Sequence, residues 1–450
     1  MLWQCQKSAR TMTPSPLRFL PMPTNARAAA CALSAAPSAL LKWYKNMLNV
    51  CTPEEAIEII RREFAGCSTD TELLPLSSCV GRVLAEDITA NEYVPDFDRS
   101  TVDGYAVRAA DTFGCSDAMP AVLTLRGIVS MGSSSGIVIH EGECAYVPTG
   151  GEIPEGADAM VMIEHSESYG NEEIGILKAA APGNNIIYRG DDVFPGKTVL
   201  KAGRVLRAED IGALAALGMS EVALKKRPAI GIISTGDELV PVGKKPGAGQ
   251  VRDVNSDMLA SSVELFGAQA KQFGIIKDGY MRLRSAIVEN LDSCDALLIS
   301  GGSSVGQMDS TCAVIEELGT LLLHGIAMKP GKPTIMGRIG SKPVIGLPGH
   351  PAAAFFVSDI FVRELTAIML GIAPRSFTAS ALLTEAVSAN HGRAHYCGVV
   401  LSEQDGKLCA RPVRSKSGLI SSLAGCDGYF CIPRDSEGCA KGDEITVFLR

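Results

Sequence analysis

The sequence predicts a multidomain protein in which a central parallel α/β domain is combined with a β-rich inserted module and a C-terminal module resembling a β-barrel. The chain has 450 residues, about three times the roughly 150 residues of one domain. Between residues 227 and 370, short apolar runs alternate with helical patterns, which is typical of a parallel α/β sheet. On both sides of this region, short apolar runs are separated by Gly and Pro, which is typical of β-structure.

The elements expected in the central domain follow from this alternation. Strands are predicted at 229–233, 273–276 and 296–299, and helices at 256–266, 282–291 and 310–318. A further helix is predicted to begin after Thr52, because Thr-Pro-Glu-Glu offers an N-cap, a proline in the first turn and acidic residues near the helix N-terminus. Residues 208–217 return to helical spacing. Outside the central domain, strands are predicted at 121–125, 137–139, 159–163, 399–401 and 444–449.

These patterns divide the chain into five parts. We expect an extension (1–46), an N-terminal linking domain (47–95 and 186–226), a β-rich inserted domain (96–185), the α/β domain (227–374) and a C-terminal β domain (375–450). The extension has six Lys and Arg and no Asp or Glu, so the remainder has 36 Lys and Arg against 50 Asp and Glu, a net charge of −14. Its composition fits a transit segment, a misassigned start ahead of Met47, or a disordered tail. We assign it no function.

The composition excludes several classes of function. A net charge of −8 argues against a nucleic-acid partner, and 5% aromatic residues offer few stacking platforms. The longest apolar helix candidate, 352–362, is too short to span a membrane. The 14 cysteines are scattered and form no CxxC, which predicts a reducing, cytoplasmic location and no zinc site. Small-molecule chemistry is therefore the better prediction.

Four predicted strand ends carry residues suited to ligand binding, because ligands of doubly wound sheets lie beyond the carboxyl ends of the strands. Each end alone has the features of an ordinary tight turn, but four in one sheet predict a site. No GxxxxGK[ST] and no GxGxxG after a strand occurs, so a nucleoside triphosphatase or dinucleotide dehydrogenase is disfavoured. The candidate binding residues are Ser234, Thr235, Gly236 and Asp237; Gly301, Gly302, Ser303 and Ser304; Lys329, Pro330, Gly331 and Lys332; and Pro348, Gly349 and His350.

Two carboxylates beside these ends are candidates for holding a divalent cation. Asp309 follows the glycine loop and Asp278 follows the predicted strand 273–276. Carboxylates near anion-binding amides are useful for a cation that bridges phosphate oxygens. The structural alternative for both is helix capping or turn formation. A general-base role for His350 is the weaker hypothesis, since a His beside Pro and Gly commonly belongs to a turn.

Further segments complete a resemblance to a known family. These are Asp98 to Ala106 (DRSTVDGYA), Thr149-Gly150-Gly151, 154–159 and Arg189-Gly190-Asp191-Asp192. With the four strand ends, in this order, the chain resembles the molybdopterin molybdenumtransferases of the MoeA family, which includes the E domain of gephyrin and plant molybdenum insertases. The resemblance extends from about residue 50 to the end, and its α/β domain resembles the MoaB and Mog proteins.

The resemblance implies a homodimer that binds adenylylated molybdopterin, transfers molybdenum from molybdate to the dithiolene, and hydrolyses the phosphoanhydride with Mg2+ to release AMP. An upstream adenylyltransferase and acceptor molybdoenzymes are the implied protein partners. It implies catalytic roles for Asp309, Asp278, Glu238 and Asp103, metal binding by Asp309, Asp278 and Glu238, anion binding by Lys329 and Lys332, a C-terminal ligand at Ser417, and partner-chain contributions from Asp103, Thr149 and Asp192.

The sequence departs from the family at three places. Gly398 stands where a second arginine is usual, so Gly398→Arg is expected to raise activity at low molybdate, with Arg411 or Arg414 as substitutes. His350 stands where Asn is usual, and DRSTVDGYA replaces a DNSAMDGYA-type segment. Three alternatives stay open: the adenylyltransferase that makes the adenylylated pterin, a peptide-binding scaffold, and a paralogue that binds pterin without inserting metal.

Overall fold

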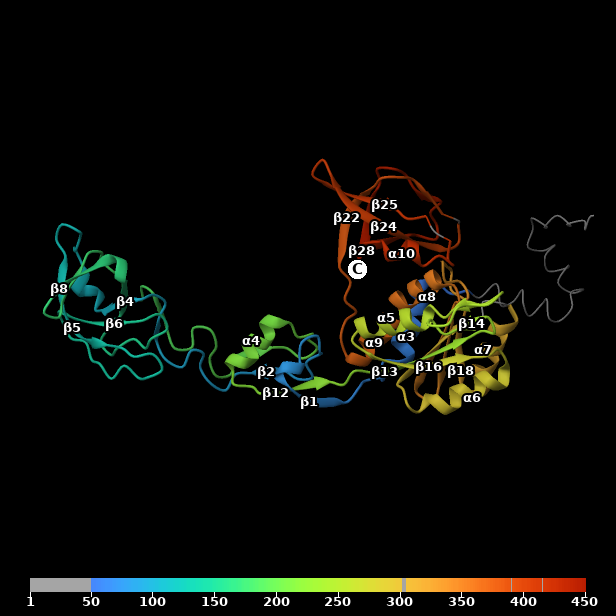
Figure 1. The fold of residues 1–450 in the computed structure, drawn as a ribbon, viewed down its shortest axis with the longest axis horizontal. Helices are drawn as coiled ribbons and strands as arrows, with labels where there is room; N and C mark the ends of the chain where they lie inside the picture. The colour runs from blue at the N-terminus through green and yellow to red at the C-terminus, as the bar shows by residue number, and fades with distance from the viewer. Residues whose placement is uncertain (1–49, 302–304, 390, 415) are drawn as a thin grey trace, which may run out of the picture.

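The computed structural model describes residues 50–301, 305–389, 391–414 and 416–450. The predicted extension and three residues of the glycine loop, Gly302, Ser303 and Ser304, lie outside this description, as does the side chain of Asp309. The molecule is elongated: the inserted β-rich sheet lies at one end, and the α/β sheet and the C-terminal sheet lie at the other (Figure 1). The described part contains no helix that is both long and apolar enough to cross a membrane.

The helix predicted after Thr52 is confirmed as α3 (Pro53–Glu63). The Thr52 hydroxyl accepts a hydrogen bond from the Glu55 N–H, and the Glu55 carboxylate accepts one from the Thr52 N–H, which makes a capping box. The apolar face of α3 packs into the core of the α/β unit and against α9 (Arg363–Leu370). The packing partners of α3 therefore lie in the α/β unit, and the domain bounds expected from the sequence stay a prediction.

The linking region is crossed by the chain twice. Its two antiparallel pairs and a short helix enclose a small core that includes Leu84, Leu214 and Leu224. The predicted helix at 208–217 is confirmed. The elements are β1 (Thr71–Pro75) with β12 (Glu221–Lys225), β2 (Ile88–Thr89) with β11 (Thr198–Leu200), η1 (Leu76–Ser78) and α4 (Ala208–Ala216).

The inserted module is a six-stranded sheet in the order β7-β4-β6-β5-β9-β8. The predicted strands at 121–125 and 159–163 are confirmed, but 137–139 contributes only a single bridge from Val138 to Glu155, so that prediction of a strand is wrong. The elements are β4 (Gly104–Val107), β5 (Ala121–Ile128), β6 (Glu143–Val147), β7 (Ala159–Met162), β8 (Ser166–Gly170) and β9 (Glu173–Ile176), with η2 (Ala109–Thr112), η3 (Ile163–His165) and the pair β3 (Arg99–Ser100) and β10 (Ile186–Ile187).

The central sheet has the order β16-β13-β17-β21-β20-β18. The first four strands are parallel, as predicted, and β20 and β18 join antiparallel, so the sheet is mixed. The three predicted strands and three predicted helices are confirmed; the helix predicted at 256–266 is shifted by one residue and the other five elements are longer than predicted. The strands are β13 (Ala229–Thr235), β16 (Gln269–Ile276), β17 (Ala296–Gly301), β18 (Thr320–His324), β20 (Ile335–Ile339) and β21 (Lys342–Leu347).

Helices cover both faces of this sheet. One apolar core joins the sheet to α3, α5, α8 and α9, and the other joins it to α6 and α7. A short parallel pair, β14 with β15, stands beside the end of β13. The remaining bounds are α5 (Asn255–Leu265), α6 (Tyr280–Leu291), α7 (Val305–Leu318), α8 (Pro351–Val357), η4 (Ser358–Val362), β14 (Leu239–Val240) and β15 (Val251–Arg252).

The C-terminal module is a barrel. Each strand pairs with the next in the order β24-β25-β22-β28-β26, and β26 pairs with β24, which closes the sheet. The strands expected at 399–401 and 444–449 are part of it. The elements are β22 (Thr378–Leu383), β24 (Ala394–Gln404), β25 (Lys407–Pro412), β26 (Gly428–Ile432) and β28 (Glu444–Leu449), with β19 (Met328–Lys329) added at the edge, the pair β23 (Val387–Ser388) and β27 (Gly438–Cys439), and α10 (Ser421–Ala424).

Candidate functional site

Three of the four predicted strand ends meet at one edge of the central sheet. In the register of β13 with β17, Ser234 lies opposite Ser300 and Thr235 lies opposite Gly301; Ser300 in turn lies opposite Leu347 of β21, next to Pro348. Gly301 has φ +138°, and a Cβ there would lie 2.1 Å from the carbonyl oxygen of Thr235. Only glycine allows the two strand ends to approach this closely.

Two of the predicted acidic segments also meet at this edge. The Asp237 N–H donates to the Asp278 carboxylate at 3.2 Å, and the Lys277 ammonium donates to the Asp237 carbonyl at 2.7 Å. A Cβ on Gly236 would lie 2.8 Å from a carboxylate oxygen of Glu238, so that carboxylate lies beside Gly236. Burial raises the pKa of Asp278, and the negative charges of Asp237 and Glu238 raise it further.

This arrangement fits a divalent cation. Carboxylates that lie close to one another are stabilised by a hard cation, and oxygen ligands are those Mg2+ prefers. The described side chains, from which Asp309 is missing, contain no group of three or more His, Cys, Asp or Glu able to hold a metal.

The structure removes the capping alternative for both candidate aspartates. The helix expected from residue 310 begins at Val305, so position 309 lies within α7 and not at its cap. The N-cap of α6 is Gly279, and the Asp278 carboxylate accepts a bond from Asp237 across the sheet edge.

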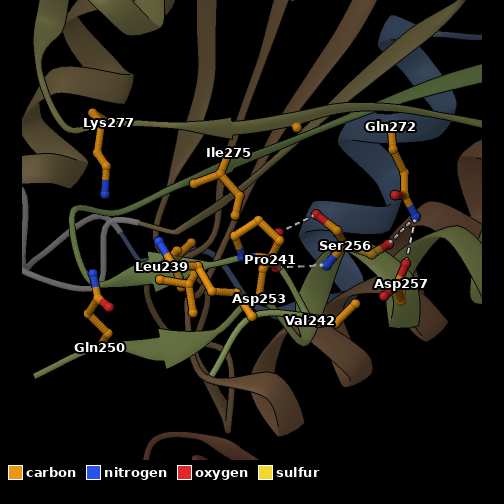
Figure 2. A pocket seen from close by; sticks show the side chains of 13 residues that line it. Leu239, Pro241, Val242, Gln250, Asp253, Ser256, Asp257, Gln272, Ile275 and Lys277 are labelled. Carbon is orange, nitrogen blue, oxygen red and sulfur yellow. Dashed lines mark hydrogen bonds between the residues drawn. The ribbon is translucent and has the colours of Figure 1, made fainter. Parts of the chain in front are cut away.

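A buried hydrogen-bond network behind these strand ends was missed by the sequence analysis. The Ser256 hydroxyl donates to the Asp253 carboxylate at 2.6 Å (Figure 2). It also lies 2.8 Å from the Ser234 hydroxyl. The Asn255 side-chain amide donates to the Ser300 hydroxyl at 2.8 Å and to the Gly349 carbonyl at 3.0 Å. The sequence did show Asp253, Asn255 and Ser256 together at the start of a predicted helix, but such a cluster on its own indicates only helix capping.

A cavity of about 610 Å3 opens beside the same edge, between β14 and the end of β16 (Figure 2). Asp253 and Ser256 of the buried network line it, and so does Lys277, which holds the Asp237 backbone. The sequence analysis did not select the polar side chains that line it from outside the strand ends, Lys244, Gln250, Asp257 and Gln272. Glu238 and Asp278 do not line the cavity, but Leu239 and Lys277, which adjoin them in the chain, do.

The turn after β21 and the C-terminal candidate Ser417 contact each other. His350 precedes the first residue of α8, and its Nδ1 lies 2.9 Å from the Ser417 hydroxyl. The Ala352 N–H donates to the Ser417 carbonyl at 3.0 Å. His350 makes no side-chain cap on α8. The turn after β21 is thus joined to the barrel by two hydrogen bonds.

The lysine turn was wrongly assigned to the α/β sheet. Met328 and Lys329 form β19, which pairs parallel with β24 of the barrel, so that Lys329 lies opposite His395. Burial and the charge of Lys329 lower the pKa of His395. The Lys332 carbonyl accepts a bond from the Ile326 N–H, and Pro330 and Gly331 form the intervening turn. A two-residue strand has too little periodic pattern to reveal its partner.

Gly398 has no room for the arginine expected at its position. A Cβ there would lie 2.7 Å from the Cys426 sulfur and 3.3 Å from Leu423. Since that side chain would enter packed structure, Gly398→Arg is expected to lower stability, and a higher activity at low molybdate stays a prediction for the folded fraction. Arg414 is held by the Ala386 carbonyl at 3.0 Å and by Glu385.

Of the other predicted residues, Asp103 and Thr149 lie in the inserted module, and Asp192 lies in the linking segment that follows it. The Asp103 carboxylate accepts a bond from the Thr149 N–H at 2.8 Å, and the Asp192 N–H donates to the Val94 carbonyl. Within one chain this group lies far from the edge of the α/β sheet (Figure 1). The predicted site residues therefore fall into two separate clusters.

Fold and site together define a protein of the molybdopterin-binding type, with an α/β domain between β-rich modules. Three family profiles match: "MoeA N-terminal region (domain I and II)" at residues 51–218, "Probable molybdopterin binding domain" at 231–367, and "MoeA C-terminal region (domain IV)" at 380–449. The chain belongs to the MoeA family.

Individual relatives agree. The molybdopterin molybdenumtransferase of Bacillus subtilis is 32% identical over 411 residues, covering 90% of this chain and 95% of that protein. The enzyme of that name from Haemophilus influenzae is 31% identical, covering 84% and 94%. The crystal structure of the molybdopterin biosynthesis protein moeA from Pyrococcus horikoshii OT3 matches with a TM-score of 0.79 at 33% identity, covering 89% of this chain and all of that one.

Proposed function

We propose that this protein inserts molybdenum from molybdate into the dithiolene of adenylylated molybdopterin, with Mg2+-dependent hydrolysis that releases AMP. The observation that carries the proposal is the meeting of the β13, β17 and β21 ends with Glu238 and Asp278 at one sheet edge, beside a cavity of about 610 Å3. The family members named molybdopterin molybdenumtransferases in Bacillus subtilis and Haemophilus influenzae align with 90% and 84% of this chain, which supports the proposal.

The residues divide the work by their chemistry. Asp278, Glu238 and Asp309 would hold Mg2+, which when bound would neutralise phosphate charge and polarise phosphorus. Lys277 fixes the backbone that presents Asp237 and Glu238. Lys329 and Lys332 would attract the anionic phosphate or molybdate, and their turn is anchored to the barrel through β24. The Ser234, Thr235 and Gly301 backbone would hold the conjugate close to the sheet edge.

Asp103, Thr149 and Asp192 would come from a second copy of the chain. All three are exposed, and within the described residues their side-chain and Asp192 backbone bonds join them to one another, Val94 and Lys197 and not to the α/β sheet of their own chain. The inserted module and the linking segment that follows it also carry exposed apolar side chains, among them Phe97, Tyr188 and Phe194, which a second subunit would cover. We therefore propose a homodimer in which two chains form each site.

The test is a single-turnover assay with purified protein, adenylylated molybdopterin, Mg2+ and molybdate, in which AMP and molybdenum cofactor are measured. Wild-type protein is expected to release both, and EDTA is expected to abolish the release. Asp278→Asn is expected to lower the rate by about 100-fold or more, because it removes charge from the proposed metal site. The matched control is Asp292→Asn, since Asp292 is a fully exposed aspartate at the far end of α6.

Three results would contradict the proposal. AMP release that survives EDTA would remove the metal from the reaction. Equal activity in Asp278→Asn and Asp292→Asn would remove Asp278 from the site. Binding of the adenylylated pterin without any AMP release would instead support the paralogue that binds pterin without inserting metal.

A further inference from the structure

We infer that Asn255 is a positioning residue for this reaction: its side-chain amide sets the spacing between the ends of β17 and β21. The inference rests on the proposed function, because it concerns the same sheet edge. Asn255 is the first residue of α5 and is 7% exposed. Its amide nitrogen donates to the Ser300 hydroxyl at 2.8 Å and to the Gly349 carbonyl at 3.0 Å.

The orientation of the amide follows from one of these partners. A backbone carbonyl only accepts hydrogen bonds, so the atom facing Gly349 must be the amide nitrogen. Both of its hydrogens are then used, and each ties down a residue next to a predicted binding segment. Ser300 directly precedes Gly301, and Gly349 directly precedes His350. The pairing of β17 with β21 ends at Ser300 and Leu347. Beyond this point, the Asn255 side chain joins the two strand ends.

The other half of the amide is unsatisfied. Asn255 Oδ1 is buried and has no hydrogen-bond partner. A buried acceptor without a partner destabilises a fold, and rotating the amide would only place this acceptor against the Gly349 carbonyl. The unsatisfied Oδ1 atom therefore accompanies the two hydrogen bonds that the Asn255 amide nitrogen donates at the sheet edge. Such a cost, located between two binding segments, indicates a functional constraint rather than a packing one.

The neighbouring bonds make the position rigid. Asp253 accepts bonds from the Ser256 N–H and hydroxyl, and the Ser256 hydroxyl lies 2.8 Å from that of Ser234 at the end of β13. The start of α5 is therefore tied to β13 through Ser256, and to β17 and the turn after β21 through Asn255. Three strand ends are held by one helix start, and Asn255 makes two of the three connections.

Asn255→Asp tests the inference, because it preserves the shape and removes both donors. A carboxylate facing the Gly349 carbonyl and the Ser300 hydroxyl repels the first and reverses the bond to the second. We expect kcat for AMP release to fall by about 100-fold, the effect of a displacement of about 1 Å in a catalytic geometry. The matched control is Asn290→Asp, since Asn290 also donates to a backbone carbonyl, that of Ala286 at 2.8 Å, but on α6.

Activity is compared per natively folded molecule, with thermal unfolding and near-ultraviolet circular dichroism measured on each variant. A role in stability alone would lower the melting temperature and leave kcat per folded molecule unchanged. Asn255→Ala introduces no buried charge, so it provides the same comparison if Asn255→Asp does not fold. Equal kcat in the Asn255 variants and Asn290→Asp, with an active wild type, would overturn the inference. A wild type that releases no AMP would instead refute the proposed function.

Discussion

The two clusters of predicted site residues differ in how well their polar groups are satisfied. At the edge of the α/β sheet, the pKa of Asp278 is raised by burial and by neighbouring negative charge, and Asn255 Oδ1 has no partner. In the inserted module, Asp103 is exposed and accepts the Thr149 N–H, as an ordinary turn would require. The sheet edge therefore holds a carboxylate and a buried amide oxygen whose free energies ligand binding would lower. In the inserted module, the Asp103 carboxylate already has a hydrogen-bond partner. This difference fits a site in which the sheet edge binds and the inserted module completes it.

The largest expected effect comes from combining a variant of each cluster. Asp278→Asn and Asp103→Asn homodimers are each expected to lose about 100-fold or more in AMP release. When the two chains carry different tags and are co-expressed, the purified heterodimer would have one intact site of two and about half of wild-type activity. A heterodimer as inactive as both homodimers would show that the two residues act within one chain.

A pair of glycine substitutions compares the packing of the two clusters. Gly301→Ala would place a Cβ 2.1 Å from the Thr235 carbonyl oxygen, whereas a Cβ at Gly150, beside Thr149, would have its nearest neighbour 3.6 Å away. Overpacking and the positive φ together are expected to cost Gly301→Ala about 3 kcal/mol or more. The positive φ alone is expected to cost Gly150→Ala about 1 kcal/mol. Denaturant unfolding measures both, and equal losses would show that the sheet edge is not tightly packed.

The smallest effect separates the two carboxylates by their contribution to stability. Removing the Asp103 carboxylate with Asp103→Ala leaves the Thr149 N–H without its partner and is expected to cost about 0.5–1 kcal/mol. Asp278→Asn, measured in EDTA, is expected to leave stability unchanged or raise it. A raised carboxyl pKa means that the fold disfavours the ionised form, and the amide oxygen can still accept the Asp237 N–H. Destabilisation by Asp278→Asn would mean that this carboxylate is structural.

Local signals carried the predictions that the structure confirms. The capping box at Thr52 and Glu55 depends on residues three apart, and β13, β16 and β17 are apolar runs ended by turn residues. The antiparallel hairpin of β20 and β21 was not predicted, although its two-residue connection, Gly340-Ser341, is too short for a parallel crossover and was a usable local signal. The assignment of the lysine turn failed for a different reason, since pairing with β24 joins residues 66 positions apart and leaves no local signal.

The sequence by itself determined the family, the order of the modules and the chemical types gathered at the strand ends, because these depend on residue identity and spacing along the chain. Only the tertiary structure decided that Asn255 joins Ser300 to Gly349, that His350 meets Ser417, and that Gly398 faces Cys426. These contacts join residues 28 to 94 positions apart in the chain. Their geometry depends on how sheet, helix and barrel pack, and packing is set by all the side chains together and not by any local pattern.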